Sequence, residues 1–371
     1  MLAGFGGGQK LNPSVQYLGI NLGSRVIAIS LAIVLCSGCY VSRQAWHQGR
    51  LLSSSRPIEE VLRDQATPVE TRNKLQKVKS ILAYAGRERL HVDGAYDHYI
   101  QTQQPVVSYL VQAAEPTKLE LVTWWFPIVG RVPYLGYYDK GERDAEAERL
   151  ASRGLDVALG GAGAFSSLGW FDDPIFSSML QRRDAELAHL FFHELTHRTL
   201  WVPHAAAFNE NLAEYVAVVL TRQYLQDQGD QSALIAYDLR RQDKELFSAW
   251  LEALRRELQT LYDNASMPVE QILRRKAEIL SDFQKTPLKP NFKQVDLVGS
   301  EIWNNASIMS ASLYNPDFQS FDRLRKCMGG PSMRDFLDMI GKQLKDFEGD
   351  PMSGALTLCT NQSIKERAIV D

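Results

Sequence analysis

The stretch that decides the fold is His189-Leu190-Phe191-Phe192-His193-Glu194-Leu195-Thr196-His197, residues 189–197. Its leucines and phenylalanines predict a buried helix from about Asp184 to Leu200. Because His193 and His197 are four residues apart, a helix places both imidazoles on one face, where they can reach a single ion. Burying two histidines and a glutamate is costly unless they find partners. We therefore expect a metal site here; the alternative is a structural polar network, or two satisfied core histidines.

The residue types in this pattern suit zinc. Imidazole nitrogens are good zinc ligands, and a catalytic zinc keeps one position open for water. Glu194 lies next to His193 and can take a proton from the water held by the metal as that water attacks a carbonyl. The pattern predicts one zinc ion and a hydrolytic reaction with Glu194 as the catalytic base.

A catalytic zinc needs a third protein ligand, and the next predicted helix, from Asn209 to about Gln226, supplies candidates. A turn around Pro203 would bring Glu210 back over the zinc face. Glu214, one helical turn further on, can accept a hydrogen bond from the free nitrogen of a ligand histidine. The two glutamates could also exchange these roles. His204 is a weaker alternative ligand, and His189 is expected behind the ligands or on the surface.

The N-terminal 38 residues differ from the rest of the chain. They contain no acidic residue, and an apolar run over residues 26–35 follows Arg25. The ending Ser37-Gly38-Cys39 resembles a bacterial lipoprotein signal with Cys39 as the lipidated residue. A plain cleaved signal and an uncleaved N-terminal anchor are the alternatives. We expect a protein of the bacterial cell envelope, anchored to the membrane and facing the periplasm.

The rest of the chain has the composition of an ordinary globular protein, and its net charge of −3 does not suggest a nucleic-acid partner. We expect one α+β, predominantly α-helical domain over residues 39–371, with a small β-sheet in about 88–175 and a helical part in about 176–371. Cys327 and Cys359 can form one disulfide or remain two buried thiols. The individual predictions are helices on either side of Pro68 within 58–85, β-type residues around 106–124, a helix over 141–153, a strand over 156–159, helices over 231–263 and 268–284, a helix through 303–305, and one or two helices from Phe318.

Taken together, His193-Glu194-x-x-His197 and Asn209-Glu210 resemble the gluzincin metallopeptidases. Nearly the whole chain after the signal is similar to a family of bacterial proteins described as putative aminopeptidases, many of them predicted lipoproteins. The resemblance implies a zincin-like fold, zinc at His193, His197 and Glu210, Glu194 as base, and a peptide substrate. Its further motifs are Trp125-Phe126-Pro127-x-x-Gly130, Tyr134-x-Gly136-Tyr137, Phe165-Ser166-Ser167-Leu168-Gly169-Trp170-Phe171-Asp172-Asp173-Pro174, and Asn304-Asn305-Ala306 with Tyr314.

Hydrolysis through this site would also need a donor for the developing oxyanion. Tyr314 and Tyr215 are candidates, each with core packing as the alternative. The segment from Asp156 to Ser167 could bind an extended peptide along its backbone edge. Two other functions remain open at this point: a zinc endopeptidase, and a non-catalytic envelope lipoprotein or binding module that retains the fold.

Overall fold

The computed structural model of this 371-residue chain describes residues 44, 46–47, 49–126, 130–162, 173–285, 303–312 and 318–367. The chain divides into two compact units, Met1–Arg50 and Leu51–Asp371, and all elements named below belong to the second. The predicted signal over residues 1–38, and Cys39 with it, lies outside the described residues. Within the described ranges, no helix combines the length and the apolar character that a membrane span requires.

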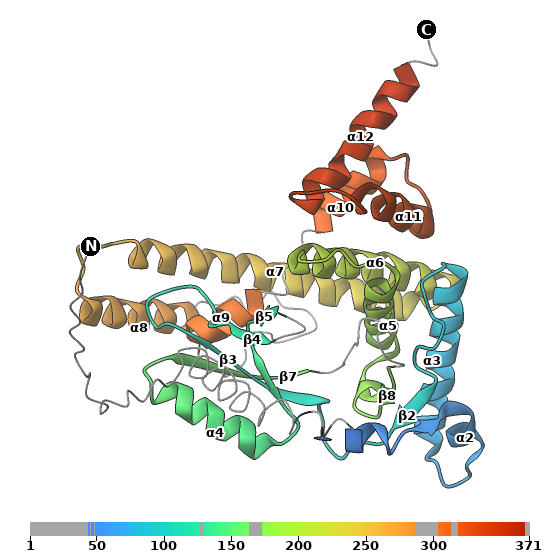
Figure 1. Cartoon of the computed structure of the whole chain (residues 1–371), viewed down its shortest axis with the longest axis horizontal. Coiled ribbons are helices and arrows are strands. Elements are labelled where there is room, and N and C mark those ends of the chain that lie inside the picture. Colours follow the sequence, from blue (N-terminus) through green and yellow to red (C-terminus); the bar gives the residue numbers. More distant parts are fainter. Residues whose placement is uncertain are drawn as a thin grey trace, which may run out of the picture. The chain divides into compact units, whose positions relative to one another are not determined.

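The main sheet has β3 (Ser108–Ala114) at its centre, beside β7 (Asp156–Ala162) (Figure 1). β6 (Leu135–Tyr137) pairs with the other side of β3. Both neighbours are antiparallel to β3, and β7 pairs along its full length, from Ser108 opposite Ala162 to Ala114 opposite Asp156. Among the described strands, β7 has β3 as its only partner and so forms one edge. The sheet predicted before the zinc helix is confirmed.

Two smaller pairings complete the β-structure. β4 (Trp124–Phe126) and β5 (Gly130–Val132) form an antiparallel pair. A separate sheet has the order β1 (Arg56–Pro57), β2 (His98–Ile100) and β8 (Ile175–Phe176), with β2 parallel to β8. We did not predict β8, because two residues between Pro174 and a helical region give no alternation that could reveal a strand.

The predicted end of the β7 strand at Leu159 was too early, because the strand continues through Gly160 and Gly161 to Ala162. A Cβ atom added at Gly161 would lie 2.5 Å from Cγ1 of Val106. Glycine therefore lets the strand pass directly beside Val106 instead of ending it. Leu159, Gly160 and Gly161 are all exposed.

Helices before the His-Glu-x-x-His segment agree with the sequence pattern. α2 (Ile58–Arg63) and α3 (Val69–Arg87) lie on either side of Pro68. α4 (Lys140–Ala151) begins after Asp139, whose side chain accepts a hydrogen bond of 2.9 Å from the backbone of Glu142. It is followed by Gly154 with φ +79°, and it packs against β3 and β7.

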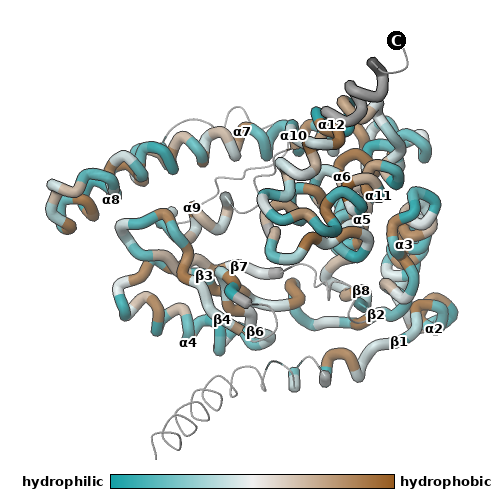
Figure 2. The backbone as a smooth tube through the Cα atoms, turned by 45° about the horizontal axis from the view of Figure 1, so that its top comes forward, coloured by the Kyte–Doolittle hydropathy of each residue, from teal (hydrophilic) through white to brown (hydrophobic). Residues whose placement is uncertain are grey.

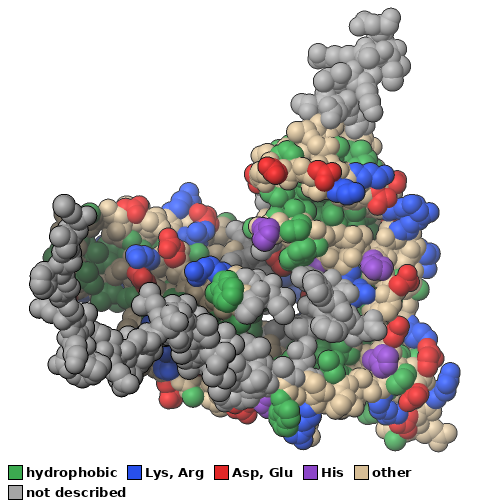
Figure 3. All heavy atoms as spheres, in the orientation of Figure 1, with side chains coloured by type: hydrophobic (Ala, Val, Ile, Leu, Met, Phe, Trp, Pro, Cys, Tyr) green, Lys and Arg blue, Asp and Glu red, His purple; other side chains and the backbone are tan. Residues whose placement is uncertain are grey.

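The central helices are α5 (Asp184–Thr199) and α6 (Ala206–Asp227), which pack against each other, followed by the long α7 (Gln231–Tyr262) and α8 (Val269–Lys285). Phe191, Phe192 and Leu195 on α5 are fully buried in the main core, which also takes in α3 and α6. Figure 2 shows hydrophobic and hydrophilic residues alternating along α3, as burial of one face requires. On the face shown in Figure 3, acidic and basic side chains of the described residues are interspersed.

A buried polar network joins the helical part to the sheet. Lys276 of α8 forms an ion pair with Asp156 of β7 and donates to the carbonyl of Pro116 at 2.9 Å. The backbone of Asn305 donates to the same carboxylate at 2.8 Å, and Asn304 donates to the carbonyl of Val157 at 2.9 Å. These contacts fix the start of β7 and leave its later residues exposed.

The C-terminal region forms α9 (Asn305–Ser312), α10 (Phe318–Cys327), α11 (Met333–Leu344) and α12 (Pro351–Arg367). The helix predicted through Trp303 begins only at Asn305. The one or two helices expected from Phe318 are three. Gly329 and Gly330, with φ values of 84° and 67°, separate α10 from α11, and Gly349, with φ 129°, lies between α11 and α12. A disulfide joins Cys327 to Cys359, with 5.5 Å between the Cα atoms, which decides between the two alternatives left open for these residues. The predominantly helical α+β class is confirmed.

Candidate metal centre

A short turn between α5 and α6 brings the two predicted ligand helices together. Leu200 caps α5 in extended conformation, and His204 has a left-handed φ of 61°. Asn209, only 1% exposed, closes the turn with two hydrogen bonds: its Oδ1 accepts from the backbone N–H of Val202 at 2.9 Å, and its Nδ2 donates to the Val202 carbonyl at 2.8 Å. The residue beside Glu210 thus holds the turn that returns the chain over the histidines.

The structure brings His193, His197 and Glu210 together. The two Nε2 atoms of the histidines lie 3.2 Å apart. Glu210 reaches both: Oε2 lies 3.3 Å from Nε2 of His193, and Oε1 lies 3.4 Å from Nε2 of His197. His197 is 5% exposed, whereas the side chain of Glu210 is 43% exposed, so the group is open on the carboxylate side.

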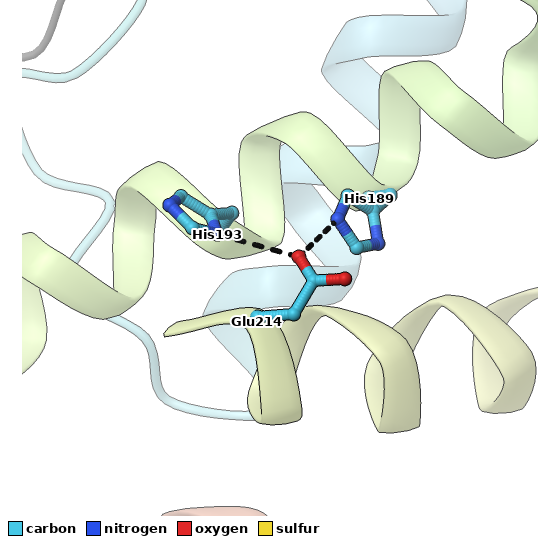
Figure 4. Close-up of side chains that lie close together, drawn as sticks. All are labelled: His189, His193 and Glu214. Carbon is cyan, nitrogen blue, oxygen red and sulfur yellow. Dashed lines mark hydrogen bonds and ion pairs between the residues drawn. The ribbon is translucent and has the colours of Figure 1, made fainter. Parts of the chain in front are cut away.

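A second group shares His193. Figure 4 shows Glu214 between His189 and His193, both on α5. Oε2 of Glu214 lies 2.9 Å from Nε2 of His189 and 3.9 Å from Nδ1 of His193. Both groups bring three possible ligand atoms within 4.8 Å of one another.

The two groups differ in what their nitrogen atoms already bind. In the His189 group, the closest pair is at hydrogen-bond distance, and the other ring nitrogen of His189 is bonded to the Tyr237 hydroxyl at 2.8 Å. In the Glu210 group, two Nε2 atoms and the carboxylate of Glu210 converge on one point, and the shortest contact among them is the 3.2 Å between the two nitrogens. The geometry therefore favours Glu210 as a metal ligand and Glu214 as the partner of His193 Nδ1, the assignment preferred from the sequence.

Electrostatics around the two glutamates support ionised carboxylates. Burial alone would raise the pKa of Glu210, but hydrogen bonds and charge from His193 and His197 hold that pKa well below the ordinary range. Burial acts the same way on Glu214, but His189 outweighs it and brings the pKa of Glu214 to about 2. For His193, burial lowers the pKa, while its bond to Glu210 and the surrounding carboxylates raise it overall.

Glu194 lies in a different environment. Burial raises its pKa, the two neighbouring histidines lower it, and the carboxylates of Glu210 and Asp173 raise it further. Asp173 is 2% exposed and lies 3.8 Å from the guanidinium of Arg198, which is one helical turn beyond Glu194. The raised pKa suits a group that has to take up and release a proton.

Two aromatic residues at the site were not predicted as functional. Trp201 lies edge-on to His197, with 5.5 Å between the ring centroids, and is 38% exposed. Tyr134 is 41% exposed, and its pKa is raised by burial and by the negative charge of Glu210. Tyr134 belongs to the Tyr-x-Gly-Tyr motif of the family resemblance, which was the one sequence signal that pointed to it.

Other candidate residues lie elsewhere. Tyr215 is fully buried, with its ring against Phe318, Phe321 and Phe336, so core packing is confirmed for it and a role as oxyanion donor is not supported. The reason is helical geometry: adjacent residues point about 100° apart, so Tyr215 turns away from the face that carries Glu214. His204 is exposed in the turn and belongs to neither ligand group. Tyr314 lies outside the described residues.

Comparison with known proteins identifies one family. The family model described as putative aminopeptidase matches residues 39–347, which include every candidate site residue of α5 and α6. No curated protein and no solved structure matched the chain. The family model covers most of the chain, and its description points to peptidase activity and a peptide substrate. The chain belongs to the putative aminopeptidase family.

Proposed function

We propose that this protein is a zinc-dependent peptidase that acts as an aminopeptidase. The observation that carries the proposal is the convergence of two Nε2 atoms 3.2 Å apart with both carboxylate oxygens of Glu210, at 3.3 and 3.4 Å. In a zincin-like peptidase, these three residues would hold the metal.

The donor set fits zinc. When each imidazole carries its proton on Nδ1, the two Nε2 lone pairs and the Glu210 carboxylate are all acceptors, and a shared cation satisfies them together. Two nitrogens and one carboxylate leave the fourth tetrahedral position open. When bound, zinc would polarise a substrate carbonyl and lower the pKa of a water molecule to about 7.

The proton transfers are assigned to Glu194. Its carboxylate takes the proton of the attacking water and gives it to the leaving amine, and the raised pKa makes the carboxylate a stronger base for the first of these steps. Tyr134, exposed and within electrostatic reach of Glu210, is our candidate donor for the oxyanion.

We assign the peptide backbone to the edge of β7 that pairs with no described strand. Leu159, Gly160 and Gly161 are exposed there, and two successive glycines let another chain approach closely. An extended substrate would add to this edge as a further strand. The rest of the predicted segment, residues 163–167, lies outside the described residues.

We also propose that the protein is anchored to the membrane through Cys39 and faces the periplasm. The Cys327–Cys359 disulfide supports an oxidising compartment, since such bonds are rare in the cytosol of most organisms.

The test compares Glu194→Gln with Glu186→Gln, which changes an acid on the same helix that pairs with Arg240 at 2.8 Å. Wild-type protein is expected to bind one zinc ion and to release fluorophore from aminoacyl substrates. Chelation should abolish this activity, and zinc should restore it. Glu194→Gln should bind zinc but lose hydrolysis, and Glu186→Gln should retain both. Full activity in Glu194→Gln would refute the assignment, and equal cleavage of substrates with blocked N-termini would show an endopeptidase instead.

A further inference from the structure

His189 is the histidine of α5 for which the proposed mechanism has no use, yet both its ring nitrogens are bonded. Nε2 lies 2.9 Å from Oε2 of Glu214 on α6, and Nδ1 lies 2.8 Å from the hydroxyl of Tyr237 on α7. The His189 side chain is 18% exposed, and Tyr237 is 5% exposed. Three helices thus meet in one short chain of polar contacts behind the metal ligands.

The chemistry of the partners fixes the direction of these hydrogen bonds. An ionised carboxylate only accepts, so Nε2 of His189 donates to Glu214. A neutral imidazole with its proton on Nε2 has a lone pair on Nδ1, and the Tyr237 hydroxyl therefore donates to it. Tyr237 thereby stabilises the tautomer of His189 that can donate to Glu214.

The same carboxylate oxygen faces His193. Oε2 of Glu214 is 3.9 Å from Nδ1 of His193, and a dashed line marks this contact in Figure 4. Nε2 of His193 lies instead toward Glu210 and His197. A carboxylate on the Nδ1 side favours a proton on that nitrogen and leaves the lone pair on Nε2. Without a donor from His189, the Glu214 carboxylate would lose its shortest contact and the constraint on its orientation.

We propose that His189 is a positioning residue of the metal site: with Tyr237, it holds the Glu214 carboxylate against His193, so that His193 presents its Nε2 lone pair to the metal. This inference rests on the zinc site of the proposed function. It concerns metal affinity, which can be measured without substrate.

The experiment measures the zinc affinity of the full chain by competition with a chromophoric chelator. His189→Leu removes the donor, and a loss of about 10- to 100-fold in affinity is expected, the usual effect of removing a partner that orients a ligand. His189→Gln keeps an N–H donor at a similar reach and should bind zinc within about threefold of wild type. Tyr84→Phe is the matched control, because it removes a 3.0 Å tyrosine–carboxylate bond to Asp227 at the other end of α6, and should not change the affinity.

A double-mutant cycle tests whether His189 acts through Glu214. In a Glu214→Leu background, His189→Leu should cause no further loss of zinc affinity. The inference would be overturned if the zinc affinity losses of His189→Leu and Glu214→Leu multiplied in the double variant. Equal zinc affinities of wild type, His189→Leu and His189→Gln would also overturn it. A merely structural role would lower the unfolding midpoint of the apoprotein without separating the Leu and Gln variants in affinity.

If His189→Leu fails to fold, Tyr237→Phe carries the test, since it removes one hydroxyl only. It should weaken zinc binding by about three- to tenfold, because the tautomer of His189 is then no longer fixed, and unchanged affinity would overturn the inference. Failure of the proposed function has a different signature: wild-type protein itself would bind no stoichiometric zinc.

Discussion

Replacing Asn209 tests how the turn between α5 and α6 supports the site. The side chain is 1% exposed and makes two hydrogen bonds, of 2.9 and 2.8 Å, with the backbone N–H and carbonyl of Val202. A buried hydrogen bond contributes about 1 kcal/mol net, and leaving its backbone partners unpaired adds to the loss. Because Val202 is only partly buried, water can form hydrogen bonds with some of its freed backbone groups. Asn209→Ala should therefore lower the free energy of unfolding by about 2–3 kcal/mol.

Asn209→Asp tests separately the two hydrogen bonds that Asn209 makes with the backbone of Val202. An ionised aspartate still accepts from the Val202 N–H, but it places negative charge against the Val202 carbonyl, so it should destabilise at least as much as alanine at pH 7. A protonated aspartic acid can both accept and donate. Its destabilisation relative to wild type should therefore shrink as the pH falls below about 5.

Urea unfolding of the metal-free protein at about pH 7 and about pH 4 measures both effects, and zinc competition shows whether Glu210 is displaced. Asn209→Ala should also weaken zinc binding, because the adjacent residue is a proposed ligand. A loss of stability below about 0.5 kcal/mol, the scatter expected of an ordinary surface substitution, would refute the argument that these bonds hold the turn.

Three further predictions follow from the structure. Replacing Cys327 and Cys359 by alanine opens a loop with a sequence separation of 32. By the loop-entropy relation, this should lower the free energy of unfolding by about 3–4 kcal/mol, as measured by urea unfolding. A loss below about 1 kcal/mol would show that the chain is ordered there without the disulfide. Acid should release zinc. The pKa of His193 lies above its usual 6.5, so protons compete with the metal at a higher pH than they would at an ordinary histidine. Equilibrium dialysis should show the zinc affinity falling about tenfold per pH unit for each proton bound. Affinity that stays constant from pH 8 to 6 would contradict this. Tyr134→Phe should lower kcat by about 100-fold with little change in KM if its hydroxyl stabilises the oxyanion, whereas a rise in KM alone would assign it to substrate binding.

Local sequence patterns predicted the helices well because each pattern reports its own geometry. Apolar spacing located α5 and α6 to within a few residues, and Pro68 marked the break between α2 and α3. The failures occurred where tertiary contacts override local preference. The glycines of β7 suggested the end of a strand, but pairing with β3 carries the strand through them.

The candidate site divides in the same way. The sequence by itself determined that His193 and His197 share a helix face with Glu194 beside them, because the four-residue spacing fixes neighbours on a helix. It also favoured Glu210 over Glu214 as the proposed third ligand, with His204 as a weaker alternative. The tertiary structure supports that preference through the position of His189 against Glu214, and only the packing of α7 brought Tyr237 to His189. Periodicity encodes how a segment faces its surroundings, whereas contacts between distant segments depend on how many side chains pack at once. The contacts of His189 with Glu214 and Tyr237 therefore become visible only in the folded chain.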